Sequence, residues 1–257
     1  MVIFWNGNKS TARQHHELDV LQYLLAGSES PSEIQNDMTD YPNAEDESNI
    51  FFRGVDLFVT VAGNQKFSHR QFFSVPHPVC EGILGCRLLI IRRNDIPLFQ
   101  SVTLDLLQEK TAGIPATWAD ADIFRHNHLP VCEAGNIRDI LHALQQGECD
   151  YVSLGINEAE EILSQHPEIA KDLCIEPTTL IYYPLPLVFY VSPLRPDLKR
   201  LLNTRAQHCC ESGEMAQLVY RHYGKYIRRA RLKHRHVIYL DNPFLPEDFT
   251  GFDFFYC

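Results

Sequence analysis

The chain has 257 residues, of which 45% are hydrophobic and 22% are charged, so it can bury a full core and is not a disordered chain. This length fits one large domain or two small ones. The formal net charge of −10 argues against a nucleic-acid-binding protein, because such proteins bind by neutralising phosphate groups.

The apolar runs are short. Residues 88–91 and 187–191 are two of the longest, and both fall far below the ~20 residues that a membrane-spanning helix needs. Residues 1–5 have neither the basic start nor the long apolar run of a secretory signal, so we expect a mature exported form or a cytosolic protein.

The sequence carries no motif of a known catalytic or metal centre. The eight cysteines form no CxxC pair, and an even number permits disulfides in an oxidising compartment. We expect Cys149 and Cys174, which lie in apolar runs, to be small core residues. Since no GxSxG, phosphate-loop or HExxH motif is present, we expect no catalytic residue, no cofactor and no metal ion.

The first fifty residues predict a strand and a helix followed by a polar segment. Residues 2–5 are apolar and precede the turn signal Asn6-Gly7-Asn8. Gly27 ends a helix whose apolar residues recur at helical spacing, namely Leu18, Leu21, Tyr23, Leu24 and Leu25. Residues 28–49 are polar and acidic, which indicates a surface segment or a poorly defined strand and loop.

One pattern occurs twice and indicates two α/β units. Gly54-Val55-Asp56 precedes an apolar strand, 57–61, and Gly147-Glu148-Cys149-Asp150 precedes another, 151–154. A helix that Asn136 can cap leads into the second copy and ends at Gly147. The two copies favour two lobes of similar build, although a single doubly wound sheet would also contain such units.

The remaining elements suggest an inserted lobe. We expect extended segments at 73–78 and 178–186, strands at 88–91 and 187–191, and helices at 159–164, from 198 and from 215. Two extended segments that flank one inserted α/β unit are what a double crossing between lobes would look like.

Longer runs resemble a known family. They are Phe73-Ser74-Val75-Pro76, Gly85-Cys86-Arg87, Thr103-Leu104-Asp105-Leu106-Leu107, Thr117-Trp118-Ala119-Asp120, Tyr182-Tyr183-Pro184-Leu185-Pro186, Ser212-Gly213-Glu214-Met215 and Asp241-Asn242-Pro243-Phe244. Together with the repeated glycine–aspartate pattern, their order resembles the bacterial extracellular solute-binding proteins of family 3. The resemblance covers roughly residues 2 to 246.

The resemblance implies an α/β chain with the two-lobed type II periplasmic binding protein fold and two hinge crossings. It assigns residues 1–85 and 185–257 to the first lobe and 86–184 to the inserted second lobe. The hinges would lie near 82–87 and 178–186, and ligand would be held in the cleft between the lobes.

The implied function is non-enzymatic. We expect a periplasmic monomer that captures a small polar organic solute for an ABC-type transporter, with a membrane transporter or sensor as partner and no nucleic acid. The alternative is a sensory or scaffold protein that retains the fold and binds a protein partner, since a fold does not fix a function.

Two departures from the family argue against an ordinary amino-acid ligand. Family members hold the ligand carboxylate with an arginine in a Thr-x-x-Arg stretch, whose planar fork suits a carboxylate. Here Arg70 lies closer to Phe73 than that pattern places it. Gly155 stands where the family places an acid for the ligand's amine, with Glu158 three residues later.

The candidate ligand-binding residues are Asn6, Asn64, Arg70, Trp118, Asp120, Glu158 and Tyr183. Most of them also have a structural reading. Turn chemistry can explain Asn6 and Asn64, and Arg70 can be a surface residue. Asp120 can cap a helix, and Glu158 can be a first-turn acid favoured by the helix dipole. Tyr183 can serve simple packing, while Trp118 offers a flat face for stacking.

Overall fold

The computed structural model describes residues 1–26 and 33–249. Its internal contacts divide the chain into two units, each discontinuous in sequence. Unit 1 holds Met1–Gly82, Pro186–Lys225 and the described chain from Phe244 onward, and unit 2 holds Ile83–Leu185 and Tyr226–Pro243.

This division differs from the expected lobes mainly at residues 226–243, which were assigned to the first lobe with the rest of 185–257. They pack in unit 2 because they contain β12 (His236–Tyr239), which runs parallel to β10 (Thr179–Tyr182). The two strands are far apart in sequence, so local pattern could not reveal the pairing.

Unit 1 is built on a five-stranded sheet in the order β2-β1-β3-β11-β4. Strand β1 is parallel to β2 and β3, and β11 is antiparallel to β3 and β4. The strands are β1 (Val2–Trp5), β2 (Ile34–Asp37), β3 (Leu57–Val61), β4 (Phe73–Val75) and β11 (Leu187–Val191). The sequence predictions at 2–5, 57–61 and 187–191 are confirmed.

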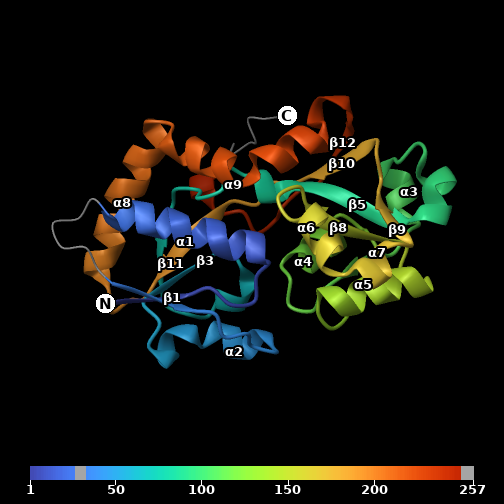
Figure 1. Ribbon diagram of the computed structural model, residues 1–257. Coiled ribbons are helices and arrows are strands. Elements are labelled where there is room, and N and C mark those ends of the chain that lie inside the picture. The colour runs from blue at the N-terminus through green and yellow to red at the C-terminus, as the bar shows by residue number, and fades with distance from the viewer. Residues whose placement is uncertain (27–32, 250–257) are drawn as a thin grey trace. The chain divides into compact units, whose positions relative to one another are not determined.

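Helices α1 and α8 pack beside each other, and α8 lies against β4 and β11 (Figure 1). A separate core cluster joins Trp5, Phe58 and Tyr190 on the sheet to Ile50 and Phe67 in the short helices. The helices of this unit are α1 (Thr11–Ala26), α2 (Ala44–Ser48), η1 (Ile50–Arg53), η2 (Gln65–Phe67), α8 (Pro196–Glu211) and η6 (Glu247–Phe249), with α9 (Glu214–Ala230) beginning here.

The polar segment 28–49 is more regular than its composition suggested. Its described part contains β2, which pairs along its whole length with β1. It also contains α2, and the side chain of Asn43 caps the N-terminus of this helix by accepting a hydrogen bond from the backbone amide of Asp46. Tertiary pairing therefore gives order to a segment without a hydrophobic pattern. Gly27, the predicted helix end, lies outside the described residues.

Unit 2 has a sheet in the order β12-β10-β5-β8-β6-β7, with β9 also paired to β5. Its further strands are β5 (Cys86–Arg92), β6 (Ala112–Ile114), β7 (Val131–Glu133), β8 (Tyr151–Gly155) and β9 (Leu173–Ile175). Its helices are η3 (Ile83–Gly85), η4 (Arg93–Phe99), α3 (Leu104–Gln108), α4 (Asp120–His126), α5 (Ile137–Gln146), α6 (Ala159–Gln165), α7 (Pro167–Ala170) and η5 (Leu232–His234).

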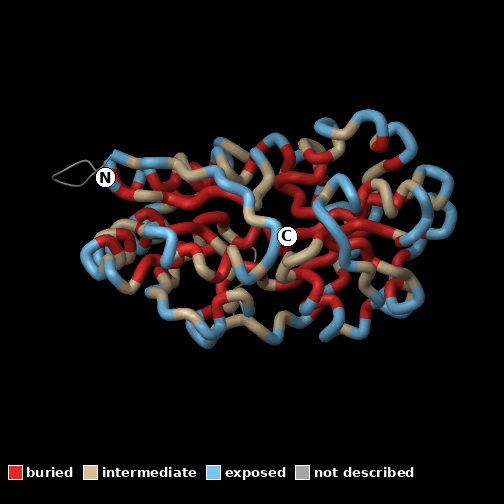
Figure 2. Tube along the Cα trace, turned by 90° about the horizontal axis from the view of Figure 1, so that it is seen from below, coloured by how far each residue is buried: buried red, intermediate tan, exposed pale blue. Residues whose placement is uncertain are grey.

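The repeated glycine pattern forms the predicted helix-to-strand connections. Asn136 caps α5 in a full capping box with Asp139, and Gly147 ends it at φ 82°, which favours glycine. Gly54 ends the short helix η1 at φ 87° in the same way. Strand β8 follows the second connection, and β11 pairs with β3, which follows the first. Both β8 and β11 are buried throughout, and buried residues are drawn in red in Figure 2.

Within residues 1–26 and 33–249, no helix is both long and apolar enough to cross a membrane.

A buried histidine in unit 1 makes stability depend on pH. His16 is fully buried, with Nε2 2.7 Å from the Val79 carbonyl oxygen and its ring 5.1 Å from that of His222. Burial lowers the pKa of His16 from 6.5 to about 4. Because the unfolded chain binds the proton more readily, we expect unfolding free energy to fall by up to about 3 kcal/mol as pH drops from 6.5 to 4. Urea unfolding at both pH values measures the drop, and His16→Gln should reduce it; an unchanged pH dependence in that variant contradicts the assignment.

Candidate functional site

In unit 1, polar loops meet at one edge of the sheet. Strands β2, β1 and β3 are parallel, so the loops that follow them, around Asp37–Tyr41, Asn6–Asn8 and Ala62–Asn64, leave from the same edge. Ligands of open α/β sheets bind outside the carboxyl ends of such strands.

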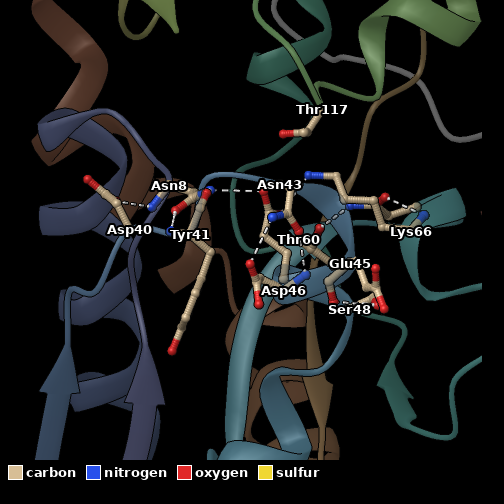
Figure 3. A network of polar contacts seen from close by, with 12 residues as sticks. Asn8, Asp40, Tyr41, Asn43, Glu45, Asp46, Ser48, Thr60, Lys66 and Thr117 are labelled. Atoms are coloured by element: carbon tan, nitrogen blue, oxygen red, sulfur yellow. Dashed lines mark hydrogen bonds and ion pairs between the residues drawn. The ribbon is translucent and has the colours of Figure 1, made fainter. Parts of the chain in front are cut away.

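A hydrogen-bonded network ties these loops to α2 (Figure 3). The Asn8 side chain donates to the Tyr41 carbonyl at 2.7 Å and to Glu47 Oε1 at 2.9 Å. On its other oxygen Glu47 accepts from Lys66 Nζ at 2.7 Å, and this carboxylate is 5% exposed. The Asp40 carboxylate accepts a hydrogen bond from the backbone N–H of Asn8 at 2.6 Å.

Asn64 and Arg70 lie at the same end of unit 1 as this network. Asn64 caps η2 by accepting from the Lys66 amide at 3.1 Å, and its Nδ2 donates to Thr60 Oγ1 at 2.8 Å. The half-buried Arg70 donates from Nη2 to Ser48 Oγ at 3.0 Å, beside Glu47 in α2. Arg70 thus contacts α2 directly, whereas Asn64 contacts the backbone of Lys66, whose side chain pairs with Glu47.

Asn6 is joined instead to α1 and is fully buried. Its Nδ2 donates to the Gln14 carbonyl at 2.9 Å, and its Oδ1 lies 3.4 Å from Lys9 Nζ. Lys9 in turn forms an ion pair with the buried Glu17 at 2.6 Å. The structure therefore places Asn6 in a buried polar cluster, apart from the contacts of Asn64 and Arg70.

In unit 2, strand directions bring distant residues to one edge. Arg87 near the start of β5 is in register with Gly155 at the end of β8, because these strands are antiparallel. The antiparallel β10 places Tyr182 opposite Cys86, so Tyr183 leaves the sheet at the same edge. Strand β6 is parallel to β8, and the loop after it leads into Asp120, the first residue of α4.

Arg87, Asp120 and Tyr183 form a buried polar triad at this edge. Arg87 Nη2 lies 2.5 Å from Asp120 Oδ1, and the guanidinium also donates to the Leu84 and Ser153 carbonyls at 3.1 Å each. The Tyr183 hydroxyl donates to the same carboxylate oxygen of Asp120. Burial, aided by the nearby carboxylates, raises the pKa of Tyr183 well above its usual value.

The triad excludes one of the two readings of Asp120. The N-cap of α4 is Ala119, which makes no side-chain cap, and the Asp120 carboxylate contacts Arg87 and Tyr183 instead. The helix-capping reading of Asp120 is therefore wrong. Its role in ligand binding, like that of the other six candidates, stays a prediction.

Glu158 and Trp118 lie on the loops of the same edge. Glu158 is 3% exposed, stands at the N-cap of α6 without a side-chain cap bond, and lies close enough to Tyr183 to help raise its pKa. Trp118 is half-buried in the loop between β6 and α4. The structure thus brings Asp120, Glu158 and Tyr183 together, with Trp118 two residues from Asp120.

Sequence reasoning missed two residues here, Arg87 and Asn157. Arg87 is 1% exposed and is the second residue of an apolar strand, which could have marked it as a buried charge in need of a partner. Asn157 is fully buried, and neither its Nδ2 nor its Oδ1 has a hydrogen-bond partner among the described residues. Nothing in its sequence context signals this burial.

Two of the thiols are poorly suited to nucleophilic or metal chemistry. Burial raises the pKa of Cys149 and of Cys210 to about 12 each. Few thiolates exist at neutral pH at such pKa values. Among the residues that the structure describes, no three His, Cys, Asp or Glu side chains gather to hold a metal ion.

Comparison with known proteins gives a fold. No protein-family model matches the chain, and no curated protein matches it. The ligand-binding core of GluR0, solved in complex with L-glutamate, is 16% identical at a TM-score of 0.63, covering 87% of this chain and 99% of that one. A mutant of ArgBP from T. maritima is 14% identical at a TM-score of 0.60, covering 87% of this chain and 95% of that one.

A third solved structure is similar to the same extent. The amino acid ABC transporter substrate-binding protein AbpA from Streptococcus pneumoniae, bound to L-arginine, is 14% identical at a TM-score of 0.59, covering 88% of this chain and 95% of that one. The chain therefore has the mixed α/β fold of the type II periplasmic binding proteins, as its sequence motifs implied.

Proposed function

We propose that this protein binds a small polar organic solute and releases it unchanged to an ABC-type transporter. The observation that carries the proposal is the buried polar edge of unit 2, where Arg87, Asp120 and Tyr183 meet Asn157, whose side chain has no hydrogen-bond partner among the described residues. A few convergent polar groups in a buried setting are typical of small-molecule sites. AbpA, which has the same fold, is named as a transporter's substrate-binding protein.

Binding without reaction fits how the charged groups are used. Arg87 and Asp120 neutralise each other, and so do Lys66 and Glu47. Burial raises the pKa of the Cys149 and Cys210 thiols. A catalytic site needs a base or nucleophile poised for proton transfer or attack, whereas these groups hold one another in place.

A sensory protein is the second candidate. It is favoured by the similarity to the GluR0 ligand-binding core, which covers 99% of that chain. Such a protein would bind its solute in the same way and pass the signal to a protein partner instead of a transporter. Measuring solute uptake by cells that lack the gene distinguishes the transport function from the sensory function. Compared with wild-type cells, uptake falls if the protein serves a transporter and is unchanged if it serves a sensor.

We also propose a periplasmic location and hinges near residues 82–87 and 178–186. Support for the hinges is that each segment contains a boundary between the two units, at Gly82–Ile83 and at Leu185–Pro186. A few such residues at the ends of elements can absorb the angle changes of a closing motion.

Native mass spectrometry of the purified protein tests the function. We expect a small polar solute to be retained, and isothermal titration calorimetry should reproduce its binding. The solute should be recovered chemically unchanged after prolonged incubation. Chemical conversion of the solute, or a protein that retains and binds no solute, contradicts the proposal.

Arg70→Ala should weaken binding of the retained solute at least tenfold, because a charged hydrogen bond to a ligand contributes about 1.5–3 kcal/mol. Its contact with Ser48 is peripheral, so the fold should persist. Arg53→Ala is the matched control, since Arg53 pairs with Asp46 at the surface of the same unit. Calorimetry measures both variants, and an unchanged affinity in Arg70→Ala removes this residue from the site.

A further inference from the structure

The end of strand β8 has an unusual arrangement of a glycine and an asparagine. A Cβ added to Gly155 would lie 2.4 Å from Asn157 Oδ1 and 3.5 Å from Arg87 Nη1. The Asn157 carboxamide therefore occupies the space in which any larger residue at 155 would begin its side chain. Glycine at 155 is a condition for the position of Asn157.

The Asn157 carboxamide is a buried polar group that the described chain does not satisfy. Its exposure is 0%, and both Nδ2 and Oδ1 lack a hydrogen-bond partner among the described residues. Buried polar groups of native proteins are nearly always hydrogen-bonded, so an unsatisfied one needs an explanation. A ligand that supplies both missing bonds would explain it.

The surrounding charges are already engaged. The Arg87 guanidinium contacts Asp120 and donates to the Leu84 and Ser153 carbonyls, while the Glu158 carboxylate lies near Tyr183. The hydroxyl of Ser153, 5% exposed and on the same face of β8 as Gly155, likewise has no partner within the described chain. The side chains of Asn157 and Ser153 are neutral, and each can both donate and accept a hydrogen bond.

We infer that Asn157 contacts the solute and selects one that presents a carboxamide or ureido group. A carboxamide satisfies another amide through two parallel hydrogen bonds, one donated by Nδ2 and one accepted by Oδ1. A guanidinium or ammonium offers only donors and a carboxylate only acceptors, so either leaves half of Asn157 unsatisfied. This inference rests on the proposed solute-binding function and adds the chemical class of the group bound in unit 2.

Calorimetry with three matched probe pairs tests the selection: L-glutamine against L-glutamate, L-asparagine against L-aspartate, and L-citrulline against L-arginine. We expect the amide or ureido member to bind at least tenfold more tightly in each pair that binds. Asn157→Asp should shift the citrulline–arginine preference at least tenfold toward L-arginine, because a carboxylate accepts from the guanidinium. Gly155→Ala should weaken binding of the neutral probes, because its Cβ displaces the carboxamide.

The melting temperature of the ligand-free protein supplies a second readout. Asn157→Leu should melt at or above the wild-type temperature, because it replaces an unsatisfied amide with an apolar group of similar size. Asn127→Leu is the matched control in the same unit, since the Asn127 side chain bonds to the Ile123 and Asp241 carbonyls. The control should melt lower than wild type and bind the probes as wild type does.

The two proposals fail in different ways. Solute binding itself fails if the wild type retains no solute and binds none of the six probes. The role of Asn157 fails, with solute binding intact, if a charged probe matches its neutral partner or Asn157→Leu binds as wild type does. It also fails if the retained solute contains neither a carboxamide nor a ureido group, or if Asn157→Leu melts below the wild type, because the amide is then structural.

Discussion

Asp120→Ala should lower the unfolding free energy by about 3–5 kcal/mol, the cost of breaking a buried ion pair. The carboxylate of Asp120 contacts both Arg87 and Tyr183, and the Arg87 side chain is 1% exposed. Without this carboxylate, the buried Arg87 guanidinium loses an anionic partner that lies 2.5 Å away, and the buried Tyr183 hydroxyl loses its hydrogen-bond acceptor. Urea unfolding followed by circular dichroism measures the loss.

Asp122→Ala in the same helix is the matched control. Its carboxylate pairs with Arg125 at 3.2 Å, but both side chains are about half exposed. Exposed pairs contribute about 0–1 kcal/mol, so this variant should unfold nearly as the wild type does. A double variant, Arg87→Met with Asp120→Leu, should recover much of the stability by removing both charges together. Equal losses in Asp120→Ala and Asp122→Ala contradict the assigned role of the triad.

Glu17→Ala should also cost about 3–5 kcal/mol at neutral pH. The Glu17 carboxylate is fully buried between Lys9 Nζ at 2.6 Å and Arg13 Nη2 at 2.8 Å. Without it, two cations remain close together in a buried setting. Burial already lowers the pKa of Lys9 from 10.5 to about 8, and losing the carboxylate lowers it further.

The lowered pKa of Lys9 makes the effect of Glu17→Ala depend on pH. The Lys9 pKa is lower in the folded than in the unfolded chain, so the unfolded state binds more protons between the two values. Stability should therefore rise with pH above about 8, and the defect of Glu17→Ala should be smaller at pH 9.5 than at pH 7. Asp19 lies on the same helix but is one-third exposed, so Asp19→Ala should lower the unfolding free energy by about 0–1 kcal/mol at both pH values. A defect that is the same at both pH values argues against a charged Lys9 as its cause.

The elements that the sequence predicted well are those with a strong local pattern. The strand at 57–61 and the helix that ends at Gly147 follow from apolar spacing, a capping asparagine and a glycine with positive φ, all within about fifteen residues. The polar segment 28–49 has no such pattern, and β2 forms there because β1 supplies its hydrogen-bonding partner.

The candidate site was predictable only in part. Asp120, Glu158 and Tyr183 each follow a strand end that the motif order made recognisable, and the structure brings them together, while their role in binding stays a prediction. Arg87 was overlooked as a site residue because its partner, Asp120, lies thirty-three positions away and is brought to it by β5 and α4. Asn157 was overlooked because neither burial nor the lack of a partner can be seen along the chain.

The sequence by itself determined the elements that have a strong local pattern, since periodicity, caps and glycine turns act over a few neighbouring residues, and the order of its motifs resembled a family with the observed fold. Only the tertiary structure decided which charges pair, that Asp120 serves Arg87 instead of its own helix, and that residues 226–243 join unit 2 through β12. The physical reason is that these outcomes depend on burial and on strand register between distant segments. A one-residue change of register alters every such contact while leaving the local pattern the same.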